Sequence, residues 1–251
     1  MMKGLLTVLL VLFISVSHAS VGHEVALKTF DLNVQDETRL QRGAKLYMNY
    51  CSGCHSLRFM RYNRMAHDLG LTTFDGELDT DLLFSNLIFT QAKVFDPIQI
   101  SMPPEDAMQW FGIVPPDLSL SAREKGPFWI YTYLTSFYAD KTRPFGSNNL
   151  LKPDVAMPNV LEPLAGKIIA VDDNNNPNLT TISHLLQVEK GEMNLAEFES
   201  AVQDLVTFLA YVSEPAQLVR YDIGKGVLIY LVVFLVLAYL LKKVYWRRLH
   251  K

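Results

Sequence analysis

Residues 47–59 read "YMNYCSGCHSLRF" and contain the chain's only two cysteines, Cys51 and Cys54, followed directly by His55. A disulfide between these cysteines would enclose two residues and constrain little of the unfolded chain, so it would be a weak cross-link. A structural zinc site needs four ligands, and the sequence has no second cysteine pair to complete one. Neither common structural use of cysteine therefore explains this stretch.

The segment before the cysteines argues against a thioredoxin-like redox pair, which follows a strand and opens a helix. Residues 36–50 instead have a helical pattern, with Leu40, Ala44, Tyr47 and Tyr50 on one face. In C-x-x-C-H, the two thiols form thioethers with the haem vinyl groups and the imidazole binds the iron. Cys51, Cys54 and His55 are thus predicted to hold one covalently attached haem c.

A second axial ligand would favour an electron carrier over an enzyme with an open iron site. Met102 and Met157 each precede a proline, which restricts the local backbone and would aim the sulfur reproducibly. The spacing favours Met157, because it lies in a loop before a terminal packing helix, and Met102 is expected to fill the core. His67 is expected on a polar surface, and His184 is expected to be packed or solvent-facing.

Both ends of the chain carry apolar segments. Residues 1–19 have a charged Lys3, an apolar run and a small-x-small site, which predicts a signal peptide cut before Ser20; an uncleaved anchor helix is the alternative. The uncharged run Gly226–Leu241 has 16 residues, about 24 Å as a helix, and reaches bilayer thickness with its apolar neighbours. Five basic residues follow it, which predicts a membrane anchor with a cytoplasmic C-terminus; a buried core helix is the alternative.

Composition and charge limit the classes of partner. With 49% hydrophobic and 20% charged residues, the chain can bury one sizeable core. Residues 20–241 carry 17 basic and 26 acidic side chains, a formal charge of −9, because six of the 23 Lys and Arg residues lie at the two ends. This charge disfavours nucleic acid as a partner. The acidic cluster at 75–81 either aids solubility or steers a basic soluble partner.

A second helix is predicted near the C-terminal end of the body. Leu195, Phe198, Val202, Leu205, Leu209 and Val212 recur at helical spacing, Asn194 can cap the start and Pro215 ends it. Gly43 would let this helix cross the first one closely. We therefore expect a mainly α fold, a c-type cytochrome helical domain with long loops and one transmembrane helix, in which "KIIAV" (167–171) forms a short strand. The expected organisation is signal peptide 1–19, haem domain 20–220, and anchor with basic tail 221–251.

Five segments, in this order, resemble the cytochrome c1 family: "CSGCH" (51–55), "PPDLSLSAR" (115–123), "RPFGSNNLLKPDVAMPNVL" (143–161), "DLVTFLAYVSEP" (204–215) and the apolar tail. The resemblance covers nearly all of the mature chain, but residues 72–110 have no clear signature. It implies that Met157 is the second iron ligand, that Pro115 packs near the haem and that Arg123 pairs with a propionate. A guanidinium suits that role because it can form two hydrogen bonds to a carboxylate.

The resemblance also implies a function. The chain would be a subunit of a quinol:cytochrome c oxidoreductase, with cytochrome b and a Rieske iron-sulfur protein as partners, and would pass electrons from the Rieske protein to a soluble or membrane-tethered cytochrome c. Its haem domain would lie in the periplasm, anchored to a bacterial inner membrane. A free-standing membrane-anchored monohaem cytochrome is the alternative within the carrier class. A haem peroxidase or ligand sensor would require an open iron site.

Overall fold

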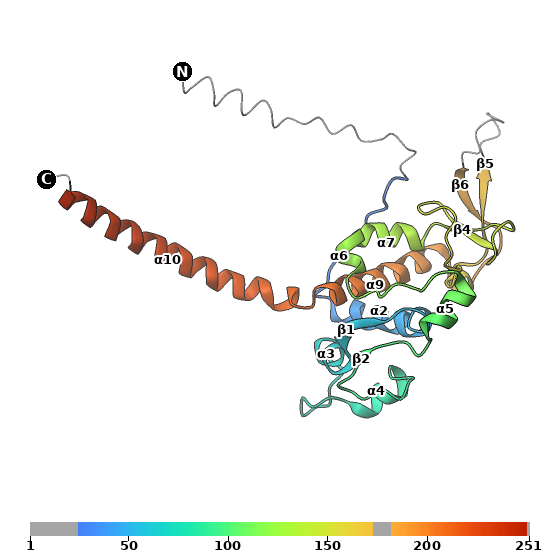
Figure 1. Cartoon of the computed structure of the whole chain (residues 1–251), viewed down its shortest axis with the longest axis horizontal. Coiled ribbons are helices and arrows are strands. Elements are labelled where there is room, and N and C mark those ends of the chain that lie inside the picture. The colour runs from blue at the N-terminus through green and yellow to red at the C-terminus, as the bar shows by residue number, and fades with distance from the viewer. Residues whose placement is uncertain (1–24, 173–181, 250–251) are drawn as a thin grey trace, which may run out of the picture.

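Two crossing helices, α2 (Glu37–Tyr50) and α9 (Leu195–Ser213), form the centre of the computed structural model, which describes residues 25–172 and 182–249 (Figure 1). The Asp36 side chain accepts a hydrogen bond from Arg39 N and caps α2. At the start of α9, Asn194 and Glu197 form a reciprocal capping box. Both predicted helices and the predicted Asn194 cap are confirmed.

The two helices approach most closely at Gly43. A Cβ atom built on Gly43 would lie 2.2 Å from the backbone oxygen of Asp204 and 2.6 Å from Cβ of Phe208. Beside this contact, the rings of Tyr47 and Phe208 lie 5.8 Å apart. The predicted close crossing is confirmed, and it depends on the missing side chain at position 43. Leu195 differs from the prediction: it is exposed, because it is the first residue of α9.

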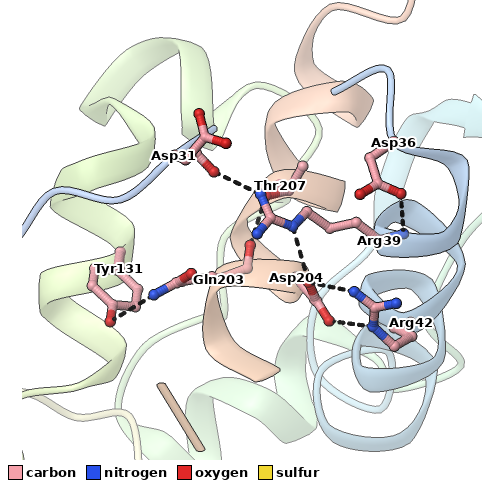
Figure 2. A network of polar contacts seen from close by, with 8 residues as sticks. All are labelled: Asp31, Asp36, Arg39, Arg42, Tyr131, Gln203, Asp204 and Thr207. Atoms are coloured by element: carbon pink, nitrogen blue, oxygen red, sulfur yellow. Dashed lines mark hydrogen bonds and ion pairs between the residues drawn. The ribbon is translucent and has the colours of Figure 1, made fainter. Parts of the chain in front are cut away.

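A buried carboxylate joins the same two helices (Figure 2). Asp204, 3% exposed, accepts hydrogen bonds from Arg42 Nε at 2.5 Å and Arg42 Nη2 at 3.2 Å. Arg39 Nε lies 3.2 Å from Asp204 Oδ1, the oxygen that Arg42 Nη2 also contacts, and Arg39 Nη1 donates to the Asp31 carbonyl oxygen. A buried charge needs such partners, since an unpaired one is strongly destabilising. The network therefore fixes how α2 sits on α9.

Short elements fill the chain between the two helices. Three of them, α6 (Ser121–Lys125), α7 (Pro127–Leu134) and α8 (Glu162–Ala165), pack on α9. The others are α3 (Tyr62–Asp68), α4 (Thr80–Asn86) and α5 (Pro104–Phe111). The segment 72–110, which has no clear sequence signature, thus contains α4, a two-residue strand (Pro97–Ile98) and all but the last residue of α5.

Two small sheets complete the body. One pairs β1 (Leu57–Arg61) with β2 (Pro97–Ile98) in antiparallel fashion. The other has the order β4-β3-β5-β6, with β3 and β5 parallel and the other pairs antiparallel. Its strands are β3 (Phe137–Ala139), β4 (Ser147–Asn149), β5 (Ile168–Asp172) and β6 (Ile182–Gln187). The predicted strand at 167–171 is confirmed as β5, whereas the rest of this sheet was not anticipated.

The last helix, α10 (Gln217–Leu249), leads away from the body (Figure 1). Within the described residues it is the one helix long and apolar enough to cross a membrane, over Gln217–Arg247, and none of its apolar window is buried. That exposure argues against a buried core helix. The mainly α fold with one C-terminal apolar helix is therefore confirmed. The predicted signal peptide lies outside the described residues.

Candidate haem site

The two cysteines lie in a tight turn at the end of α2. Cys51 N donates to Tyr47 O at 2.9 Å, and the backbone nitrogens of Cys54 and His55 donate to Cys51 O at 3.0 and 2.9 Å. Both cysteines are free thiols; Cys51 is buried and Cys54 is partly exposed. Burial raises the pKa of the Cys51 thiol to about 12 and also raises the pKa of Cys54. Two thiols held in one turn, with His55 directly after the second, suit two thioether bonds to a single haem.

His55 is held in an orientation suited to binding iron through one nitrogen. Its Nδ1 atom lies 2.7 Å from the carbonyl oxygen of Pro116. Burial lowers the pKa of His55, opposed by this hydrogen bond and by the charge of Asp117, so the neutral ring is favoured. In the neutral ring Nδ1–H donates to Pro116 and the Nε2 lone pair faces away from that bond. This is the usual arrangement of a metal-binding histidine, whose second nitrogen donates to a carbonyl or carboxylate.

The residues after the motif run alongside residues 116–119. Leu118 N donates to Ser56 O at 2.9 Å, and Arg58 N donates to the Asp117 carboxylate at 2.9 Å. Tyr47 also contributes, since its hydroxyl donates to His55 O at 2.5 Å. The structure therefore brings the "CSGCH" and "PPDLS" segments together, and Pro115 lines a cavity with Ser56 and Arg58, which follow the motif.

Arg123 lies in α6, shortly after that contact. Its side chain is exposed, and within the described part of the chain no carboxylate pairs with it. The neighbouring Glu124 pairs instead with Lys125, at 2.8 Å. The guanidinium is thus available to an external carboxylate such as a haem propionate, and this role stays a prediction.

Met157 lies in a loop next to α7. It is partly buried against the core, and its sulfur lies 3.4 Å from the hydroxyl of Tyr133. The chain just after it packs back onto the two central helices, because Leu161 and Leu164 line a small gap together with Leu46 of α2 and Val202 of α9. The Met157 loop therefore borders the same helix pair that ends in Cys51.

Asparagine side chains shape the approach to Met157. Asn149 Oδ1 accepts hydrogen bonds from the backbone nitrogens of Leu151 and Lys152, at 2.9 and 3.1 Å. Asn148 Oδ1 accepts from Asp154 N at 2.9 Å, and Asp154 adopts a left-handed backbone with φ 61°. Asparagine amides often replace backbone partners in irregular loops, so the "SNN" run is a local signal for the turn that leads to Met157.

The alternative ligands occupy other places. Met102 lines a cavity of about 150 Å³ together with Ser56, Arg58 and Asp117, beside the residues that follow the motif, and the lining includes neither His55 nor Met157. His67 is mostly exposed and lies 3.8 Å from the Asp68 carboxylate, as expected. His184 lies in β6 opposite Val171 and is exposed. Met157 differs from these side chains in its contact with Tyr133 of α7, a helix that packs on α9.

Comparisons with known proteins identify the family of the chain. Residues 26–249 match the Cytochrome C1 family. The chain is 46% identical to Cytochrome c1 of Allochromatium vinosum, over 100% of both chains. It is 41% identical to the protein named Ammonia monooxygenase gamma subunit of Nitrosomonas europaea, over 98% of this chain and 97% of that one. A chain of a solved structure titled Hyperthermophilic respiratory Complex III aligns over 98% of this chain and 96% of its own, with a TM-score of 0.41 and 14% identity.

The family match spans the whole described body and α10. It includes the turn that holds Cys51, Cys54 and His55, and the loop that holds Met157. Proteins of this family carry a covalently bound haem c, which agrees with the thiol and imidazole arrangement at the end of α2. This chain belongs to the cytochrome c1 family.

Proposed function

We propose that this chain accepts single electrons from a Rieske iron-sulfur protein and passes them to a soluble or membrane-tethered cytochrome c, within a complex that also contains cytochrome b. As a cytochrome c1, the protein is an electron-transfer subunit with a covalently bound haem c. The observation that best supports iron binding at this site is the His55 ring, whose Nδ1 is engaged by Pro116 while Nε2 is left for iron.

Four side chains would hold the haem. Cys51 and Cys54 would bond covalently to it, His55 Nε2 would bind one face of the iron, and Met157 Sδ the other. The haem supplies a one-electron couple. A thioether favours reduced iron, so a methionine ligand suits a carrier that must accept electrons readily. Pro115 would pack against the ring.

Arg123 would balance the charge at the edge of the haem. An exposed guanidinium without a protein carboxylate partner in the described chain can bind a propionate through two hydrogen bonds. Two neutral axial ligands leave no protein group at the iron that has to take up or release a proton. In each cycle one electron enters and one leaves, and no covalent bond forms or breaks.

The position of the haem domain relative to the membrane follows from α10. The family and this apolar helix make the protein membrane-anchored. Lys242, Lys243 and Arg247 follow the uncharged run, and such residues collect on the cytoplasmic side. We infer that the haem domain lies in the periplasm, at the outer face of a bacterial inner membrane.

One comparison favours a second candidate. The full-length relative named Ammonia monooxygenase gamma subunit bears a name from a different enzyme system. The second candidate for this chain is therefore a membrane-anchored monohaem cytochrome that serves another oxidoreductase. Its haem site would be the same, so the two candidates differ in partners.

Co-purification separates these candidates. The tagged full chain is isolated from native membranes in mild detergent, its companions are identified by mass spectrometry, and quinol is added while haem c reduction is followed. We expect cytochrome b and a Rieske protein in equal amounts with the chain, and rapid reduction that is lost when the Rieske protein is stripped off. Isolation of the chain alone, or with a different oxidoreductase, would contradict the proposal.

A further inference from the structure

Tyr133 makes an unusual contact with the sulfur of Met157. Its hydroxyl lies 3.4 Å from Met157 Sδ, within hydrogen-bonding distance for a sulfur acceptor. The hydroxyl has no other hydrogen-bond partner among the residues that the structure describes. Because a buried tyrosine hydroxyl normally finds a partner, the thioether fills that role here.

The Tyr133 ring is held on two sides by aromatic neighbours. It stacks on Trp129 with the ring centres 5.2 Å apart and the planes at 9°, and it meets Phe137 edge to face at 5.1 Å. These contacts restrict the ring and therefore the direction of its hydroxyl.

The backbone of Tyr133 is tied to the end of β4, from which the chain leads to Met157. Its carbonyl oxygen accepts a hydrogen bond from Asn149 Nδ2 at 2.8 Å, and Ser136 Oγ joins the Tyr133 carbonyl to Asn149 Oδ1 with two contacts of 3.3 Å. Tyr133 therefore contacts both ends of the segment 149–157. Its backbone contacts Asn149, and its hydroxyl contacts Met157. A shift of α7 would move both contacts together.

We propose that Tyr133 is a positioning residue that orients the Met157 thioether toward the iron and raises the reduction potential of the haem by hydrogen-bonding to the sulfur. The inference rests on the proposed role of Met157 as ligand. A thioether sulfur has two lone pairs. It can donate one of them to iron and use the other to accept a hydrogen bond from the Tyr133 hydroxyl.

The direction of the effect follows from electron density. The hydrogen bond draws density from the sulfur and weakens its donation to the metal. Oxidised iron depends on that donation more than reduced iron does, so the oxidised form loses more stability and the potential rises. The hydrogen bond from Tyr133 also reduces the number of orientations that the Met157 sulfur can adopt when it binds iron.

The test uses Tyr133→Phe in the full haem-loaded chain, with Tyr131→Phe as the matched control. Phenylalanine keeps the ring against Trp129 and Phe137 and removes the hydroxyl. Tyr131 lies on the same helix, but its hydroxyl accepts from Gln203 at 3.5 Å and does not contact Met157 (Figure 2). The readouts are the midpoint potential and the near-infrared band from methionine-to-Fe(III) charge transfer.

We expect Tyr133→Phe to keep the band, with a shifted position, and to lower the potential. At a fixed solution potential the ratio of oxidised to reduced protein should rise by about three- to tenfold, roughly 30–60 mV for one electron. Tyr131→Phe should change neither readout. As a second variant that keeps the side chain, 3-fluorotyrosine at position 133 is a stronger donor and should raise the potential.

The outcomes distinguish this inference from the proposed function. If Met157→Leu abolishes the band but Tyr133→Phe and 3-fluorotyrosine leave the band and the potential unchanged, the role of Tyr133 is refuted and the haem site stands. If the band survives Met157→Leu, Met157 is not the ligand, and the inference about Tyr133 falls with that assignment.

Discussion

A methyl group at Gly43 would lie 2.2 Å from the backbone oxygen of Asp204, far inside van der Waals contact. The obstacle is main chain in the middle of α9, which cannot rotate away as a flexible side chain could. The crossing of the two central helices therefore depends on glycine at this position. Since α2 ends in Cys51, the same contact sets where the haem-binding turn begins.

Gly43→Ala should force the two helices apart. Overpacking of a tight core costs about 1–3 kcal/mol, and the backbone obstacle places this variant at the upper end, about 3 kcal/mol. The free energy of unfolding can be measured by denaturant titration of the haem-loaded protein. Gly224→Ala is the control, because a Cβ atom there meets nothing within 4 Å and the residue lies in α10, away from the haem motif. Equal stability of the two variants would show that the close crossing is not required.

Asp204→Asn should lower the free energy of unfolding, because it breaks the buried network in Figure 2. The change keeps the shape but leaves Arg39 and Arg42 without their shared carboxylate. Losing one partner of a buried pair costs about 3–5 kcal/mol, and the partial exposure of Arg42 reduces this to roughly 2–4 kcal/mol. Glu199 lies on the same helix, α9, and forms an exposed ion pair with Lys28. Glu199→Gln removes this pair and should lower the free energy of unfolding by less than about 1 kcal/mol. A loss below about 1 kcal/mol for Asp204→Asn would contradict this account of the network.

The next prediction concerns the covalent attachment of haem to Cys51 and Cys54. Replacing both Cys51 and Cys54 by Ala should abolish haem that survives denaturing extraction, because no thioether can form. Each single variant should retain haem through one bond, which mass spectrometry of the haem peptide detects. Covalently bound haem in the double variant would show that the motif had been misinterpreted.

Removal of α10 should release the protein from the membrane. A chain that stops after Arg220 keeps Leu218, which packs against the core, and loses the uncharged run. We expect a soluble periplasmic protein with its haem retained and with slow reduction by quinol, since the anchor would hold the domain beside its partners. Fractionation tests this: continued association with membranes stripped of other subunits would refute the topology. Loss of haem with normal export would assign α10 a part in the haem domain.

The two central helices were predictable because their apolar faces repeat at helical spacing and their ends carry recognisable signals, such as the Asn194 cap and Pro215. Most strands of the small sheets could not be predicted, because β2 has two residues and β4 is the polar run Ser147–Asn149. In strands this short, neighbouring segments decide the pairing more than local propensity does.

The same division applies to the haem site. Cys51, Cys54 and His55 form a contiguous motif whose chemistry can be inferred from spacing alone. The carbonyl oxygen of Pro116 has no side-chain signal, so its bond to His55 emerges only from the fold. Tyr133 sits in the apolar helix "PFWIYTYL", where nothing in the pattern separates the tyrosine that contacts Met157 from its neighbours.

The most direct test of the central claim, a haem held between His55 and Met157 for electron transfer, is the near-infrared spectrum of Met157→Leu beside Met102→Leu. Leucine keeps the volume of methionine and removes the sulfur, so both proteins should fold. The account predicts that Met157→Leu loses the methionine-to-Fe(III) band and shows a lower midpoint potential, whereas Met102→Leu keeps both unchanged. Loss of the band in Met102→Leu, with a normal spectrum in Met157→Leu, would contradict it.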